Sequence, residues 1–211
     1  PSLRPLAEAL VAAVDAGHVR VHAQDRDVQA DLVAFGADGA LPPVEEEGPD
    51  AFTLTAQNLS GNKLDWFLDT HLELRGSRPA EGVGRLDATV RLTNTAPPGT
   101  TQPRYVYGPG PGATSQPAGT LRSLVTLYLP LGTSVEAVGG DATVEPVGSG
   151  TEDGRPYATF MVDVPAGEAR TVTLSLRLAP RPAGPYEVLL TPVPRVRPTT
   201  VVLDIATEGE R

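Results

Sequence analysis

Apolar and polar residues alternate along two neighbouring stretches near the middle of the chain. From Leu64 to Leu74 the even positions are apolar, with Thr70 as the exception, and residues 86–92 repeat the same two-residue period. Successive side chains of a β-strand point to opposite faces, so each stretch predicts a strand with one apolar face. Residues 76–84 between them contain glycine, proline and serine, which predicts the loop of a β-hairpin.

A helix is the competing interpretation of the first stretch, because leucines recur at every fourth position from Leu64 to Leu72. The polar Thr70 and the matching period of residues 86–92 favour the strand. On a strand, the only tryptophan of the chain, Trp66, belongs to the apolar face. We therefore expect Trp66 in the core.

The second half of the chain continues as short alternating stretches separated by turns. Residues 121–129, 157–164 and 172–178 each place apolar side chains on one face, and shorter pieces of this kind reach Ile205. About seven such strands, divided by turns that contain Gly and Pro, are typical of a β-sandwich. We therefore expect a mainly β fold, with an immunoglobulin-like antiparallel β-sandwich as its largest part.

The first part of the chain carries helical signals. Apolar residues recur at intervals of three and four between residues 3 and 16 and are followed by a glycine, which predicts an amphipathic helix. Residues 18–23 alternate like a short strand, and Asp25 or Asp27 is placed to cap a second helix that ends at Gly36. This small helix-strand-helix segment has to pack on the β-region or complete a larger upstream domain.

Shifts in composition divide the chain into three parts. Residues 41–50 are rich in proline and glutamate and predict a linker. We expect residues 1–49 to form the helix-strand-helix lead-in, residues 50–95 the β-hairpin region and residues 96–211 the sandwich. Residues 94–119 are rich in proline and glycine, and loops of this length are usually functional, so they are the leading candidate for an interaction loop.

Composition excludes several classes of function. The 211-residue chain contains no cysteine and has a formal net charge of -9. Disulfides, thiolate catalysis and cysteine-bound metals are therefore excluded, and the acidic balance argues against nucleic acid as a partner. No run approaches the ~20 apolar residues of a membrane span, so we expect no membrane insertion within this stretch. Because the chain begins at Pro1, we expect a piece of a longer protein.

Asp65, Asp69 and His71 share the polar face of the first predicted strand. Side chains two residues apart on one face of a strand lie about 7 Å from each other. Carboxylates and an imidazole at this spacing can hold a hard cation or act as acid and base. An ordinary solvated sheet face has the same composition and is the plainer interpretation.

Tyr105 and Tyr107 lie in the predicted interaction loop. Exposed rings there could stack on a sugar or on a partner protein, whereas buried rings would pack in the core. The chain carries none of the common signatures of nucleophilic, metal-dependent or phosphate-binding enzymes. We therefore assign no catalytic residue, no cofactor and no metal, and we treat the two tyrosines with Asp65, Asp69 and His71 as candidate interaction residues.

Three motifs carry a resemblance to a known family. They are the run Asn-Leu-Ser-Gly-Asn-Lys-Leu-Asp-Trp-Phe-Leu-Asp at residues 58–69, Asn94-Thr-Ala-Pro-Pro and Pro103-Arg-Tyr-Val-Tyr-Gly. Together they resemble the C-terminal region of the uncharacterised actinobacterial proteins called domain of unknown function 4012. The resemblance implies a single-pass, extracytoplasmic envelope protein, and some members are encoded near polysaccharide-assembly genes. It supplies no catalytic residues.

These observations lead us to expect a non-catalytic structural or binding module of an extracytoplasmic cell-envelope protein. Its partner would be an envelope glycan or an envelope protein, and its membrane anchor would lie upstream. The alternative is an accessory or catalytic factor in envelope polysaccharide transfer or assembly, which requires the five candidate side chains to converge in one pocket. A third hypothesis is an assembly module that adds a partner strand to an exposed sheet edge.

Overall fold

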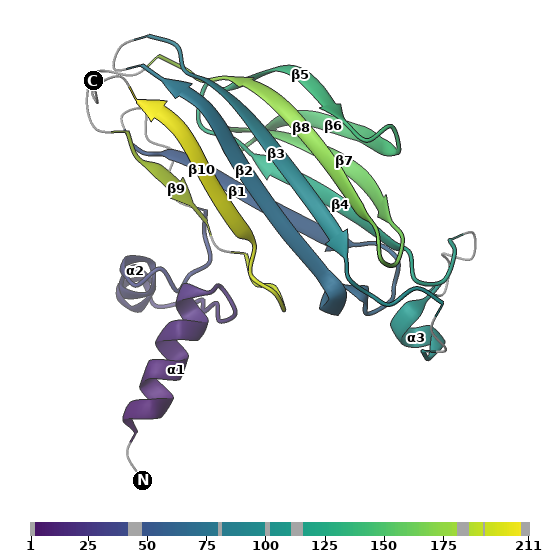
Figure 1. Ribbon diagram of the computed structural model, residues 1–211. Helices are drawn as coiled ribbons and strands as arrows, with labels where there is room; N and C mark the ends of the chain where they lie inside the picture. The colour runs from purple at the N-terminus through teal and green to yellow at the C-terminus, as the bar shows by residue number, and fades with distance from the viewer. Residues whose placement is uncertain are drawn as a thin grey trace.

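Two five-stranded β-sheets pack face to face, and two helices precede them in the chain (Figure 1). The strand order is β6-β7-β4-β1-β9 in the first sheet and β10-β2-β3-β8-β5 in the second. This arrangement confirms the prediction of a mainly β, sandwich-like fold. The structure is a computed structural model that describes residues 3–41, 48–79, 82–99, 102–110, 116–180, 186–191 and 193–207.

Most strands of the two sheets pair antiparallel with their neighbours. The first sheet consists of β6 (Val144–Glu152), β7 (Arg155–Val164), β4 (Leu121–Tyr128), β1 (Asp50–Asn58) and β9 (Val188–Leu190). The second consists of β10 (Thr200–Thr207), β2 (Leu68–Arg78), β3 (Arg85–Asn94), β8 (Ala169–Arg177) and β5 (Ser134–Gly140). At the edges, however, β9 pairs in parallel with β1 and β10 in parallel with β2. The expectation of a wholly antiparallel sandwich is therefore wrong at these two edges.

The predicted hairpin is formed by β2 and β3. Leu72 lies opposite Val90 and Leu74 lies opposite Ala88 across the antiparallel pair, and all four side chains are buried. Because β2 continues to Arg78, the loop of the hairpin begins later than the pattern predicted. The two-residue period thus identified both the strands and the face that packs inward.

The first strand of the hairpin also begins later than predicted. Leu64–Phe67 form a short 3₁₀ helix, η1, in place of the expected strand. Asn62 stabilises the start of η1, because its Oδ1 accepts a hydrogen bond from the backbone N–H of Leu64 at 3.2 Å. The tight turn interrupts the two-residue period, so Leu64 is buried while Trp66 is 62% exposed. The prediction that Trp66 lies in the core is wrong.

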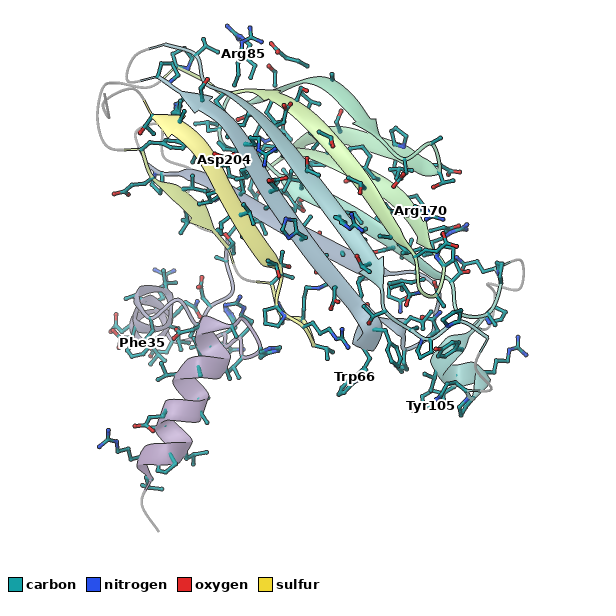
Figure 2. The ribbon with its side chains drawn as sticks, in the orientation of Figure 1. Phe35, Trp66, Arg85, Tyr105, Arg170 and Asp204 are labelled. Atoms are coloured by element: carbon teal, nitrogen blue, oxygen red, sulfur yellow. The ribbon has the colours of Figure 1, made fainter. Side chains whose placement is uncertain are left out.

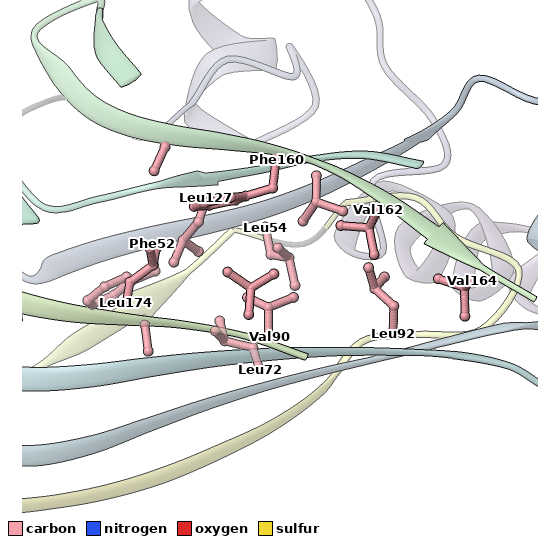
Figure 3. Packing of buried hydrophobic residues seen from close by; sticks show 14 of the residues in the cluster. Phe52, Leu54, Leu72, Val90, Leu92, Leu127, Phe160, Val162, Val164 and Leu174 are labelled. Carbon is pink, nitrogen blue, oxygen red and sulfur yellow. The ribbon is translucent and has the colours of Figure 1, made fainter. Parts of the chain in front are cut away.

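The apolar core lies between the two sheets. Side chains from β1, β4 and β7 lie opposite those from β2, β3 and β8 (Figure 3). Each sheet takes strands from residues 50–95 and from residues 96–211, so the sandwich is not confined to the second stretch. Burying one valine, leucine or phenylalanine contributes roughly 1.5–3 kcal/mol, which makes this cluster the main source of stability.

The lead-in consists of α1 (Arg4–Asp15) and α2 (Arg26–Ala34). The Asp25 side chain, one of the two predicted caps, caps α2 by accepting hydrogen bonds from two backbone N–H groups. Residues 18–23 do not form the predicted strand: their backbone makes only isolated contacts such as the bond from Val21 N–H to the Ala37 carbonyl. Neither helix contains a buried residue, and α1 extends away from the sheets (Figure 1).

Two predicted connections fall partly outside the described residues. The linker prediction rests mainly on residues 42–47, which are not described. Within residues 94–119, residues 100–101 and 111–115 are also not described, and the part between them contains the short helix α3 (Arg104–Tyr107). In the described parts of the chain, no helix has the length and apolar character needed to span a bilayer.

Candidate functional site

The three polar residues that the sequence placed on one strand face do not form one site. Asp65 lies in η1, where its Oδ2 accepts a hydrogen bond from the Asn58 side chain at 2.6 Å. Asp69 lies at the start of β2 and forms a 2.8 Å ion pair with Arg197. His71 lies further along β2, opposite Arg91 of β3. Among the described residues no group of three potential metal ligands comes together.

The two candidate tyrosines have opposite environments. Tyr107 is only 4% exposed, and its hydroxyl donates a hydrogen bond to the Pro97 carbonyl at 2.8 Å. Its ring also makes an edge contact with Phe67, with 6.3 Å between the ring centroids. Tyr105, two residues earlier in the single turn of α3, is 68% exposed. Tyr107 is therefore a packing residue, and Tyr105 is available for contact.

Trp66 and Tyr105 lie at the same end of the sandwich, which we call the aromatic end (Figure 2). The two segments that carry them are joined directly, because the Lys63 backbone N–H donates to the Val106 carbonyl at 3.0 Å. Their neighbours Phe67 and Tyr107 point inward and contact each other, whereas Trp66 and Tyr105 are exposed. Sequence reasoning selected Tyr105 but missed Trp66, because the 3₁₀ turn reverses the direction of the tryptophan.

Hydrogen bonds hold the aromatic end to the sandwich. Asn62, which is buried, donates from its Nδ2 to the Thr120 carbonyl at 3.3 Å. Asn58, at the end of β1, donates to the Asn62 Oδ1 at 3.0 Å, and the Gly110 N–H donates to the Ser60 carbonyl at 3.2 Å. Because hydrogen-bonded polar networks stiffen the backbone around them, we expect these bonds to restrict the movement of the segments that carry the two exposed rings.

A pocket of about 260 Å³ lies where the two sheets end at β9 and β10. Part of its wall is built by the connection between these strands, which crosses from the first sheet to the second. None of the five residues selected from the sequence lines it. The lining residues are Ala16, His18, Phe52, Leu54, Leu72, Leu190, Thr191, Val193, Arg195, Pro198, Thr199 and Val201.

Arg195 is the charged group of this pocket. Its Nη1 donates to the Ala56 carbonyl at 3.3 Å, while its Nε is buried and has no hydrogen-bond partner among the described residues. Burial lowers the pKa of the Arg195 guanidinium, and the negative charge of Asp65 opposes this shift. The Thr191 hydroxyl, also in the pocket lining, is likewise buried without a described partner.

Nothing in the sequence pattern distinguishes Arg195 from Arg197. Both lie in the same proline-rich connection, and arginine side chains are mostly exposed in proteins. In the structure Arg197 pairs with Asp69 outside the pocket, whereas Arg195 lines the pocket. The pocket depends on contacts between residues far apart in the sequence, such as the hydrogen bond from Arg195 to the Ala56 carbonyl, so local periodicity could not predict it.

Comparison of the chain with protein-family models, with curated proteins and with solved structures gives no match in any of the three. The resemblance to domain of unknown function 4012 therefore stays a prediction.

Proposed function

We propose that this chain is a non-catalytic binding module of an extracytoplasmic cell-envelope protein, built on an immunoglobulin-like sandwich and anchored through upstream sequence. Its aromatic end would hold an envelope glycan. The observation that carries this proposal is the exposure of Trp66 and Tyr105 at the same end of the sandwich. Tryptophan and tyrosine provide large, stiff contact surfaces, and the C–H face of a sugar ring stacks on such rings.

The scatter of the other candidate groups supports a binding role over an enzymatic one. Glycan transfer requires an acid or base within hydrogen-bond reach of the reacting sugar. Asp65 is engaged by Asn58, Asp69 is paired with Arg197, and neither residue lines the pocket. The two carboxylates selected from the sequence are thus not assembled into a pocket where they could act on a sugar.

Strand addition at the β10 edge has weaker support. The edge strand β10 is long enough to accept a partner strand, but it carries Asp204, whose Oδ2 accepts a hydrogen bond from Arg75 at 3.0 Å. Charged side chains on an edge strand discourage pairing with another chain. We therefore favour recognition through the aromatic end.

The single tryptophan gives a direct test of the proposed function. Because Trp66 is the only tryptophan of the chain, its fluorescence reports on the aromatic end without a background from other tryptophans. We expect purified cell-envelope polysaccharide to change the emission of Trp66 in a saturable way. Tyr105→Ala should weaken this binding by about tenfold, since loss of a central aromatic contact costs more than 1 kcal/mol.

Phe35→Ala is the matched control. Phe35 is also an exposed aromatic residue, at 74%, but it lies beside α2 and away from the aromatic end (Figure 2). Its removal should leave the polysaccharide affinity unchanged. Equal losses in the two variants would indicate nonspecific adhesion through apolar surface. Unchanged Trp66 emission with every envelope polysaccharide fraction would reject the glycan as the partner.

A further inference from the structure

We propose that the pocket between β9 and β10 binds a single-chain amphiphile with an anionic head group. The head would lie at Arg195, and the apolar chain would lie between the sheets. This inference does not depend on the glycan proposal, because the pocket and the aromatic end share no residue.

The inner part of the pocket is apolar and continuous with the core. Phe52, Leu54 and Leu72 belong to the buried cluster, and Leu190 and Val201 pack against it. These residues come from strands of both sheets, so an apolar chain between them would contact both layers. Removing this apolar surface from water would favour binding of the chain.

The polar part of the pocket has unused capacity for hydrogen bonding. The Nε of Arg195 and the hydroxyl of Thr191 are both buried without a partner among the described residues. A buried donor without an acceptor is unfavourable, and a guanidinium matches the geometry of carboxylate and phosphate oxygens. A carboxylate or phosphate head would supply the acceptors that Arg195 lacks.

The charges around the pocket favour an external anion. None of the described lining residues is Asp or Glu, and although the charge of Asp65 acts on Arg195, no carboxylate in the described residues lies within ion-pair distance of it. The adjacent Arg197, by contrast, has a 2.8 Å partner in Asp69. The chain has a formal net charge of -9, so a pocket arginine that forms no ion pair with any described carboxylate is a feature that would favour an anionic ligand.

The volume limits the size of the ligand. Pockets for small molecules usually measure roughly 300–1,000 Å³, so a pocket of about 260 Å³ is close to the lower limit. It suits one short alkyl chain and its head group better than a two-chain lipid. Octanoate and octyl phosphate are therefore suitable probes for the two kinds of head group.

Calorimetric titration with four probes tests the proposal. Octanoate or octyl phosphate should bind the wild-type chain. Octan-1-ol lacks the anionic head group and inorganic phosphate lacks the alkyl chain, so each should bind at least about tenfold more weakly. The amphiphile that binds more tightly identifies the head group as carboxylate or phosphate. Absence of binding by both anionic amphiphiles would overturn the proposal.

Two arginine variants separate the role of Arg195 from general charge. Arg195→Met should weaken amphiphile binding by about tenfold or more, since hydrogen bonds to charged groups are strong. The control Arg197→Met removes an equal charge from the same connection but outside the pocket lining, and it should change affinity by less than about twofold. Equal losses in both variants would refute a specific contact at Arg195.

Further variants keep the test decisive if Arg195→Met fails to fold, as judged by circular dichroism and thermal unfolding. Arg195→Lys retains the charge and should keep measurable binding. Leu190→Trp should fill the apolar part and abolish binding of both amphiphiles. Binding that survives Leu190→Trp, or octan-1-ol binding as tightly as octanoate, would contradict the proposal. Trp66 emission with polysaccharide should stay unchanged in Arg195→Lys, so failure here is distinguishable from failure of the glycan proposal.

Discussion

Tyr128 is the residue whose ionisation the structure changes most clearly. Its hydroxyl donates a 2.6 Å hydrogen bond to the Glu152 carboxylate, and its ring lies 5.9 Å from that of Tyr157. The hydrogen bond to Glu152 and, to a lesser extent, burial raise the pKa of Tyr128 to about 12. The protonated phenol is therefore favoured in the folded protein.

We predict that Tyr128 ionises later than an ordinary tyrosine when the folded protein is titrated by ultraviolet absorbance. The pKa of Tyr128 in the folded protein lies above its ordinary value of about 10. The protonated phenol therefore stabilises the folded protein fully below about pH 10, and this stabilisation is lost as pH rises through about 12. Glu152→Gln should lower the pKa of Tyr128 toward its ordinary value. Tyr128→Phe should remove the late-ionising group, and a titration that is the same in all three proteins would contradict the assignment.

Asn94 illustrates which residue properties the sequence could and could not predict. The motif that begins at Asn94 follows an alternating stretch, so the end of the strand was predictable. The partners of its side chain were not, because Nδ2 donates to the carbonyls of Gly119 and Val164, 25 and 70 residues away. Arg195 was missed for the same reason: its burial depends on where the sheets end and not on its neighbours in sequence.

At the scale of elements, a buried ion pair joins the two sheets. Asp50 of β1 and Arg78 of β2 are almost completely buried, with 4.0 Å between Oδ2 and Nε. Arg78 also donates to the Ala179 carbonyl at 2.7 Å and lies over the Tyr186 ring, 5.8 Å from its centroid. Because β1 and β2 belong to different sheets, no backbone hydrogen bond joins them, and the ion pair provides a polar link between the two layers.

We predict that Arg78→Met lowers the free energy of unfolding by about 3–5 kcal/mol, because it removes the Arg78 charge from beside the buried Asp50 carboxylate together with the hydrogen bond to the Ala179 carbonyl. Urea unfolding measures this change. The exposed pair Arg75–Asp204, which joins β2 to β10, is the matched control, and Arg75→Met should cost at most about 1 kcal/mol. Similar losses in both variants would show that burial of the Asp50–Arg78 pair is unimportant for stability.

The sequence predicted a strand correctly where that strand buries one of its two faces. Strands β2, β3, β4 and β8 each bury one face, so their sequences alternate and were identified. Residues 18–23 alternate as well, but no strand in the described part of the chain pairs with them, and they do not form one. The failure at η1 has a local cause, because the hydrogen bond from Leu64 to Asn62 favours a turn where the period indicates a strand.

At the scale of the whole molecule, burial is concentrated in the sandwich. The core cluster draws its residues from the two sheets and the connections next to them. In the lead-in, by contrast, α1 and α2 bury no side chain, and several of their apolar residues are exposed, including Leu6, Leu10 and Val11. The stability of the molecule should therefore reside in the part that follows residue 47.

We predict that a fragment beginning at Gly48 folds and unfolds like the longer chain. Its free energy of unfolding should change by no more than about 1 kcal/mol, because the helices that it lacks contribute no buried side chain. The core variant Leu72→Ala should instead cost about 2–5 kcal/mol in either background. Removing exposed leucines should also reduce self-association, which analytical ultracentrifugation can measure. A much less stable fragment would show that the lead-in, which meets the sandwich at Ala16 and His18 of the pocket, contributes to stability, and that residues 1–49 and the sheets form one cooperative unit.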